Sequence, residues 1–320
     1  VSDTAMPTYP LARYRFDCVV ERPIQQPDYA GSMLRGVFGN ALRTLVCVTD
    51  VADCHDCSLY RTCPYPLIFA PPSPPLVTGQ QFSQIPPPYI VEPPHWGAQR
   101  LAVGTTFSFH MVLMGEALQQ LSLIIRTWQQ TLARHVGGGK ARLQAVYWET
   151  PQGDEAVWTA GQLIAHTAQL VLPDVAADSP PVDVTLTFTT PLRLQEQGHA
   201  LPPERLTDSR LLLAIAKRCS LLADFHMERS LGLDFAALKA DSLRYAGQRD
   251  VVWHDWTRYS SRQHSAMTLG GVMGTWHLPQ LAPVWLPLLT LGQWLHVGKN
   301  TVFGLGAYRL GVDRATTLPR

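Results

Sequence analysis

Three observations predict an α+β fold of two tandem ferredoxin-like (RRM-like) domains. The chain has 320 residues, which is enough for two domains with separate cores. Apolar residues make up 46% and charged residues 16%, a balance that favours a packed globular protein over a disordered one. Apolar patterns follow the order strand–helix–strand–strand–helix–strand of the ferredoxin-like motif clearly in the second half, and with one strand blurred by a proline-rich segment in the first. The first half also holds a four-cysteine insertion, and the second half ends in a glycine-rich loop.

The N-terminal domain is expected over residues 1–172. Apolar side chains at positions 14, 16, 18 and 20 alternate with the charged Arg13, Arg15 and Asp17, which predicts a half-buried strand. A helix is expected from Asp28, a favourable N-cap, and its three glycines indicate that another segment packs closely against it. Residues 64–99 contain eleven prolines and predict an extended connector that obscures one strand. The remaining expected elements are a strand over 105–114, a helix over 116–135 and a strand over 141–148.

The C-terminal domain is expected over residues 182–320, after a polar linker at 173–181. Its pattern repeats the order of the first half with every element visible. The expected elements are a strand over 182–194, a helix over 208–226, strands over 251–262 and 266–277, a helix over 279–295 and a closing strand over 301–310.

Charge is distributed unevenly between the two halves. The net charge is +1, so any contact with a polyanion must come from a local patch. Residues 181–320 carry fifteen Lys and Arg against eleven Asp and Glu, a balance of +4, which leaves −3 for the first 180 residues. From Trp256 to Val312 there is no acidic residue. The C-terminal half is therefore the expected phosphate-facing half.

The sequence shows no targeting or membrane segment. The first residues lack the basic and apolar regions of a signal peptide. The most apolar window, from Leu281 to Leu291, is too short to span a bilayer and contains two prolines. We therefore expect a cytoplasmic protein with no membrane partner.

Four cysteines lie within 17 residues, at Cys47, Cys54, Cys57 and Cys63. Thiols stay reduced in the cytoplasm, and four thiolates can complete a tetrahedral zinc shell around the close Cys54–Cys57 pair. We expect a structural zinc site. An iron–sulfur cluster and four unconnected reduced thiols are the alternatives, whereas the two remaining cysteines fit a core strand and a core helix.

Two C-terminal segments suit contacts with phosphates or bases. Glycines let a backbone approach a ligand closely, and the free N–H groups of a turn beside a lysine suit a phosphate chain. On the strand from Trp256 to Gln263, alternate cationic and hydroxyl side chains would share one face, although an ordinary amphipathic strand is the alternative. The predicted contacts are Arg258, Ser260, Arg262, Gly298, Lys299, Gly304 and Gly306.

With these features in order, the chain resembles the CRISPR repeat-processing endoribonucleases of the RAMP superfamily. The resemblance begins with the glycine-rich helix from Gly31 to Arg43, the four-cysteine segment and the proline-rich stretch. It continues through Trp256 to Gln263, the pair Gly270-Gly271, and the loop from Val297 to Gly306. It covers most of the chain.

The resemblance implies cleavage of a repeat hairpin in a long precursor RNA without a catalytic metal. The ribose 2′-hydroxyl attacks the adjacent phosphate and leaves a 2′,3′-cyclic phosphate and a 5′-hydroxyl. Many members use a histidine in or just after the first helix, but here that helix contains none. The nearest histidine is His55, inside the cysteine cluster. We therefore expect the catalytic residues among His55, Tyr29 at the helix start, and Arg35, for which a packing role is the alternative.

Two other functions fit the same sequence. The chain could be a non-catalytic RNA-binding subunit of a CRISPR effector complex that holds the repeat hairpin. It could also be a zinc-stabilised protein without an RNA partner. For the endoribonuclease and for the RNA-binding subunit, the expected partners are the repeat RNA and other subunits of an effector complex.

Overall fold

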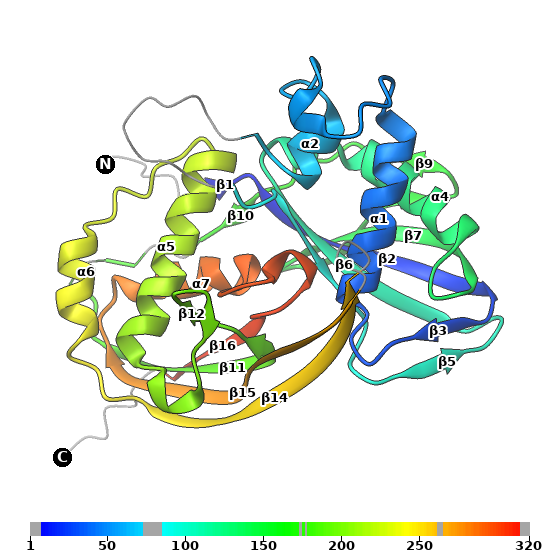
Figure 1. The fold of residues 1–320 in the computed structure, drawn as a ribbon. Helices are drawn as coiled ribbons and strands as arrows, with labels where there is room; N and C mark the ends of the chain where they lie inside the picture. The colour runs from blue at the N-terminus through cyan, green and yellow to red at the C-terminus, as the bar shows by residue number, and fades with distance from the viewer. Residues whose placement is uncertain (1–7, 73–84, 173–174, 177, 261–264, 314–320) are drawn as a thin grey trace. The chain divides into compact units, whose positions relative to one another are not determined.

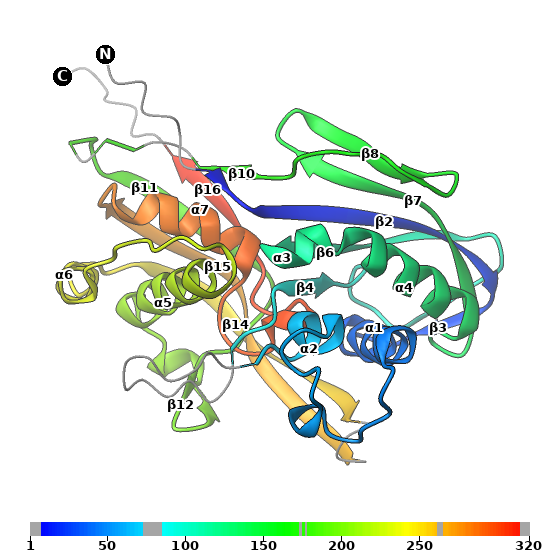
Figure 2. The same cartoon turned by 90° about the horizontal axis from the view of Figure 1, so that it is seen from above.

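The computed structural model of the chain describes residues 8–72, 85–172, 175–176, 178–260 and 265–313. It is an α+β protein with two compact units, each built on its own β-sheet (Figures 1 and 2). The N-terminal unit comprises Pro10–Gln169 and Phe225–Met227. The C-terminal unit comprises Val1–Tyr9, Leu170–Asp224 and Glu228–Arg320. No helix in the described ranges is long and apolar enough to cross a membrane.

The N-terminal unit holds a six-stranded antiparallel sheet in the order β4-β6-β2-β7-β8-β9. Its inner strand β2 is the alternating segment that the sequence predicts. The strands of this sheet are β2 (Leu11–Arg22), β4 (Tyr89–Glu92), β6 (Thr106–Met114), β7 (Lys140–Thr150), β8 (Gly153–Thr159) and β9 (Gln162–Leu163). The helices of the unit are α1 (Gly31–Val46), α2 (Pro64–Phe69), α3 (Glu116–Gln119) and α4 (Leu121–Arg134), and β3 (Ile24–Gln26) pairs with β5 (Gln99–Leu101).

Aromatic side chains form the centre of the N-terminal core. Trp128 of α4 is fully buried, 4.4 Å from the ring of Phe109 on β6 and 5.2 Å from that of Phe38 on α1. Phe16 of β2 stacks on Phe109 at 5.1 Å. Large rings with such offset contacts stabilise a core beyond their buried area. Both helices therefore cover the face of the sheet that carries the even-numbered residues of β2.

Three sequence expectations for this unit need correction. Helix α1 begins at Gly31, and its N-cap is Ala30 without a side-chain bond, so Asp28 does not cap it. The helix expected over 116–135 is divided at Gln120, whose backbone leaves the helical region (ψ 13°). The proline-rich stretch is not only a connector, because Pro64 begins α2 at the position where a missing N–H costs nothing. The obscured strand of that stretch is β4.

The C-terminal unit holds a four-stranded antiparallel sheet in the order β14-β15-β11-β16. Helices α5 and α7 pack together, since the Cys219 sulfur on α5 contacts the Leu288 carbonyl at 3.5 Å. The strands are β11 (Val182–Leu192), β14 (Gln248–Ser260), β15 (Ser265–Leu281) and β16 (Tyr308–Asp313), and the helices are α5 (Asp208–His226), α6 (Phe235–Ser242) and α7 (Trp285–Leu295). Two short pairs accompany them: β1 (Thr8–Tyr9) with β10 (Leu170–Val171), and β12 (Gln195–Glu196) with β13 (His199–Ala200).

The two largest differences from the predicted boundaries lie near the end of this unit. Pro279 does not start a helix but lies in β15, beside an irregularity between the pairs Val182–Leu281 and Val184–Leu278. A proline is tolerated where a ladder is interrupted. The segment expected to open the last strand is instead a 3₁₀ turn, η3 (Thr301–Phe303), and β16 starts only at Tyr308.

One glycine of α1 explains how α2 docks on it. A Cβ at Gly39 would lie 2.3 Å from the ring of Phe69 at the end of α2. The guanidinium of Arg35, one helical turn earlier, lies 4.2 Å from the centre of the same ring. Phe69 therefore packs against both Arg35 and Gly39 of α1, a contact that we call the clamp. At Gly36, by contrast, no atom lies within 4 Å of an added Cβ, so the expected close packing holds for only part of the glycine set.

Replacing Gly39 by alanine should lower the stability of the protein, although alanine is the better helix former. The added methyl overlaps the Phe69 ring, and such overpacking costs about 1–3 kcal/mol. Gly36→Ala is the matched control, and it should instead gain roughly 0.5–1 kcal/mol from helix propensity. Urea unfolding midpoints measure both effects. Equal shifts for the two variants would contradict the clamp.

Candidate functional site

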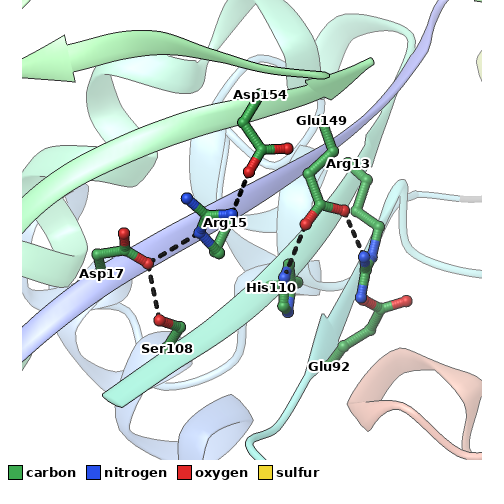
Figure 3. A network of polar contacts seen from close by, with 8 residues as sticks. All are labelled: Arg13, Arg15, Asp17, Glu92, Ser108, His110, Glu149 and Asp154. Carbon is green, nitrogen blue, oxygen red and sulfur yellow. Dashed lines mark hydrogen bonds and ion pairs between the residues drawn. The ribbon is translucent and has the colours of Figure 1, made fainter. Parts of the chain in front are cut away.

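A ladder of polar side chains crosses the N-terminal sheet on the face opposite to its helices (Figure 3). Arg13 of β2 bonds Glu92 of β4 at 2.5 Å and also pairs with Glu149 of β7. Glu149 in turn bonds the His110 ring at 3.0 Å. His110 therefore lies on the open face of the sheet.

The ladder continues along β2 at Arg15. Its guanidinium bonds Asp17 at 3.0 Å and pairs with Asp154 of β8, and Asp17 accepts a 2.7 Å bond from the Ser108 hydroxyl. The two arginines of the ladder are thus matched by four carboxylates, a balance of −2. Phosphates avoid such a surface. We read the ladder as a cross-strand structural network rather than a phosphate site.

The contribution of the ladder to stability depends on pH through the carboxylate of Glu149. Burial alone would raise the pKa of Glu149, but the hydrogen bond from His110 and the charge of Arg13 outweigh burial and hold that pKa below its ordinary value. A carboxyl whose pKa is lower in the folded state stabilises the fold above its unfolded pKa. That contribution is lost as the pH falls through the folded pKa.

Glu149→Gln should therefore destabilise the protein at pH 7 by about 1–3 kcal/mol, because Arg13 and His110 lose their ionised partner. The difference between variant and wild type should shrink as the pH falls below about 4, the unfolded pKa of a glutamate. Chemical unfolding at several pH values measures this difference. Glu155→Gln, at an exposed position of β8, is the control. A deficit that does not change with pH would argue against the charge-based explanation.

Two of the predicted catalytic residues lie in packed surroundings. Tyr29 is only 5% exposed, and its ring lies 4.5 Å from that of Trp96. Burial, with the charge of Glu92, raises the pKa of Tyr29 well above its ordinary value, so its hydroxyl is a poor general base. Arg35 stacks on Phe69, as described above, and its charge lies beside the buried Tyr89 hydroxyl. This placement matches the packing role that the sequence leaves open for Arg35.

The third candidate, His55, lies in the loop between α1 and α2. It is the middle residue of a 3₁₀ turn, η1 (Cys54–Asp56), and its backbone N–H bonds the Asp53 carboxylate at 2.9 Å. Its exposed ring lies 4.6 Å from that of Tyr60. Of the three candidates, His55 alone presents a titratable side chain to solvent. Its catalytic role stays a prediction.

The four predicted metal ligands share one loop and one cavity. Cys47 is the C-cap of α1, Cys54 and Cys57 bracket the turn η1, and Cys63 is the N-cap of α2. All four line the same cavity, and none is in a disulfide. As the side chains stand, no three His, Cys, Asp or Glu residues in the described ranges converge closely enough to hold a metal ion.

The predicted glycine-rich loop follows α7 and is fixed by its own backbone. Val297 and Gly306 pair through a 3.0 Å bond, and Gly306 donates a second 3.0 Å bond to the Pro191 carbonyl. Gly306 has a φ of 71°, and a Cβ there would lie 1.8 Å from the Val297 carbonyl oxygen. Only glycine fits this crossing.

This geometry corrects one part of the sequence argument. The loop was expected to offer free N–H groups to a phosphate, but those of Val297, Lys299 and Gly306 bond carbonyl oxygens of the protein. Gly304 and Gly306 are themselves buried. The exposed side chain of Lys299 and the partly exposed Gly298 (φ 93°) are the members of the set that a ligand can reach. Their contact with RNA stays a prediction.

Arg193 is a cation beside the loop that the sequence argument missed. Its carbonyl accepts the N–H of Lys299 at 2.9 Å, and its guanidinium donates to the Gly270 carbonyl at 2.7 Å. Its Nε atom is buried without a hydrogen-bond partner. Burial lowers the pKa of Arg193, with the charge of Asp255 opposing that effect. The sequence carries no signal for this role, because the partners of Arg193 are backbone groups.

A second missed arginine anchors the start of the loop. The Arg218 guanidinium of α5 donates to the carbonyls of Leu295 and His296, at 2.8 and 3.1 Å, where α7 ends. A cation at a helix C-terminus satisfies carbonyls that have no helical partner and opposes the negative end of the helix dipole. Burial lowers the pKa of Arg218 to about 10, so it stays charged at pH 7.

The predicted basic strand is present as β14, which pairs with β15 along its length. Arg258 opposes Met267 and Ser260 opposes Ser265 in that ladder. The side chains of Arg258 and Ser260 lie outside the described part of the structure, as does all of Arg262. Their contact with RNA stays a prediction.

Replacing Arg218 by methionine should lower the stability by about 2–3 kcal/mol, because two carbonyls at the end of α7 lose a charged donor. The neighbouring Lys217 is exposed on the same helix, so Lys217→Met removes the same charge without touching α7. Thermal or urea unfolding compares the two variants. If both lose the same stability, net charge rather than the helix end is responsible.

The comparisons with known proteins agree with this architecture. A family model described as an N-terminal domain matches residues 8–170, just over half of the chain. The model of the CRISPR-associated endoribonuclease Cas6 matches residues 186–308, a range that includes the glycine-rich loop. No curated protein sequence matches the chain.

Solved structures share the fold at low sequence identity. A chain of a partial Cas6-RT-Cas1–Cas2 complex matches 97% of this chain with a TM-score of 0.59 and 15% identity, and this chain spans about half (47%) of its length. A Cas6 product complex matches 94% of this chain and 100% of its own, with a TM-score of 0.54 and 16% identity. Cas6 of Thermus thermophilus matches 96% and 100%, with a TM-score of 0.52 and 15% identity.

Two β-sheet units and a glycine-rich loop closed on its own backbone define the class: an α+β protein with the architecture of the Cas6 structures. The family-model match over residues 186–308 and the structural matches to Cas6 proteins together place the chain with the Cas6 family of CRISPR-associated endoribonucleases.

Proposed function

We propose that the chain is an endoribonuclease that cleaves precursor CRISPR RNA within its repeats and produces guide RNA. The match of residues 186–308 to the Cas6 model carries this proposal. The strand orders of the two sheets support the finer assignment of tandem ferredoxin-like domains. If the four strands of a βαββαβ motif are numbered along the chain, both sheets have the spatial order second, third, first, fourth. In the N-terminal unit, β8 and β9 extend the sheet beyond its fourth strand.

The proposed reaction uses no catalytic metal. The 2′-hydroxyl next to the scissile phosphate loses its proton to a base and attacks the phosphorus, and the 5′-oxygen leaves with a proton from an acid. The products are a 2′,3′-cyclic phosphate and a 5′-hydroxyl. A base, an acid and a cation for the crowded phosphorane are required. We assign proton transfer to His55 and phosphate binding to Lys299, each of which is exposed.

Arg193 would support phosphate binding at the loop. Its backbone fixes the Lys299 N–H, and its own charge lies in a partly desolvated position, where it acts more strongly on a nearby phosphate than a solvated cation does. The repeat RNA would then be held by the loop, with the strand β14 alongside it. Other subunits of an effector complex are the further expected partners.

A non-catalytic RNA-binding subunit is the second candidate, and one observation favours it. Of the three residues expected to perform the chemistry, Tyr29 is buried with a raised pKa and Arg35 is stacked on Phe69. The ring of the third, His55, contacts the Tyr60 ring. No other acid or base that could share proton transfer with it is among the described contacts of that ring. A subunit that binds the hairpin and does not cut it needs none of these groups.

A cleavage assay separates the two functions. Purified protein is incubated with a labelled repeat RNA in EDTA, beside the same RNA carrying a 2′-deoxy substitution at the scissile position. We expect cleavage of the first RNA to a cyclic phosphate and no cleavage of the second. Tight binding without cleavage would favour the RNA-binding subunit. Cleavage that EDTA abolishes, while binding in the same buffer persists, would overturn the metal-independent mechanism.

Single substitutions then test the assigned roles. His55→Ala should slow single-turnover cleavage at least 100-fold, the usual scale for loss of a general base, without weakening binding. His135→Ala, at an exposed end of α4, is the control. Lys299→Ala should weaken RNA binding. It should also reduce the slope of the log association constant against log salt concentration by about 0.7–1, because one phosphate contact is lost. An unchanged salt slope would remove Lys299 from the RNA interface.

A further inference from the structure

We propose that the segment from Cys47 to Cys63 is a structural zinc site that fastens the end of α1 to the start of α2. This proposal does not depend on the activity of the protein. It rests on where the four cysteines lie, on what else holds their segment, and on how its backbone is arranged.

The four cysteines occupy the ends of three helical elements. Cys47 closes α1 and Cys63 opens α2, so a metal bound to both would join the two helices at their termini. Cys54 and Cys57 lie on either side of one 3₁₀ turn, which is closed by a 3.1 Å bond from the Cys57 N–H to the Cys54 carbonyl. A Cys-x₂-Cys turn presents two thiols to one point, which a tetrahedral metal site requires.

The burial pattern points the same way. None of the 17 residues from 47 to 63 is buried, and only six of them are shielded even in part. Four of those six are the cysteines, and the other two are Val51 and Tyr60. A segment that points its cysteines inward and almost nothing else has no apolar core of its own. Small modules of this kind obtain their stability from a metal or from disulfides, and no disulfide is present among the described cysteines.

The cavity that the cysteines line suits a thiolate-bound metal. All four thiols border it, with apolar walls from Val46, Leu59 and Pro66. Apolar walls exclude water and strengthen the attraction between thiolates and a divalent cation. The sulfurs do not yet converge. All four already line one cavity, so metal binding would draw their sulfurs together inside it.

Three hydrogen bonds support the cysteines and the loop that carries them. The Thr49 hydroxyl lies 3.3 Å from the Cys57 sulfur. The Arg43 guanidinium donates to the carbonyls of Val51 and Ala52, at 2.7 and 2.9 Å, and holds the loop against α1. Such outer contacts fix the orientation of metal ligands. On binding one Zn²⁺, the four thiols would release four protons to the solvent, and the resulting thiolate site would carry a charge of −2 beside Arg43.

Elemental analysis of the purified full chain is the direct test. We expect one zinc per chain for the wild type, for Ser58→Ala in the same loop and for Cys219→Ala in α5. The double variant Cys54→Ala/Cys57→Ala should hold none. Removing zinc from the wild-type protein with a chelator should lower its melting temperature, and adding Zn²⁺ should restore it. This measurement needs no variant. Cobalt(II) added to the stripped protein should give the visible bands of a tetrahedral thiolate site.

Three results would overturn the proposal. The first is a wild-type protein that keeps no metal after dialysis against Zn²⁺ under reducing conditions. The second is iron in place of zinc, which would indicate a cluster. The third is a melting temperature that neither the chelator nor the double variant changes, relative to Ser58→Ala.

Discussion

The partly buried guanidinium of Arg218 at the end of α7 is the contact on which the presentation of the loop depends. Arg218 bonds the last two carbonyls before the loop, at Leu295 and His296. The residues that follow cannot adjust freely, because Gly306 crosses Val297 with no room for a side chain. An anchored helix end and a close backbone crossing restrict the loop backbone. Lys299 is therefore carried on a preorganised frame, so binding a polyanion there costs little ordering entropy.

The two units distribute charge in opposite ways. The open face of the N-terminal sheet carries the ladder, in which four carboxylates outnumber two arginines, and the ring of Tyr147 there lies 4.7 Å beneath the Arg15 guanidinium. RRM domains read RNA by stacking bases on exposed aromatic rings of the sheet. A face that is net negative, with its ring covered, cannot work in that way. In this chain the resemblance to RRM domains is one of topology, and the RNA contacts that we propose lie at the loop.

Local signals in the sequence predicted the elements, whereas distant contacts decided their ends and their roles. The alternation of β2 and the helix α5 were predicted correctly because both depend on burial of one face. The glycines of α1 predicted a close neighbour, but only the fold shows that Phe69, thirty positions after Gly39, fills that space. Pro279 looked like a helix start because nothing local reveals an interrupted ladder. Arg193 and Arg218 went unnoticed for the same reason, since their partners are carbonyls that carry no sequence signature.

The same reasoning limits where catalysis can occur around α1. Arg35 and Gly39 are occupied in clamping Phe69, and Tyr29 is enclosed with Trp96, so this end of the unit is built for packing. The exposed titratable candidate, His55, lies instead on a turn bracketed by two cysteines. A general base must be held within hydrogen-bond reach of the 2′-hydroxyl, yet no residue of its loop is buried. A metal that fixed Cys54 and Cys57 would fix the turn between them. Structural zinc and catalysis by His55 would then be coupled through the backbone of a single turn, although the metal itself takes no part in the reaction.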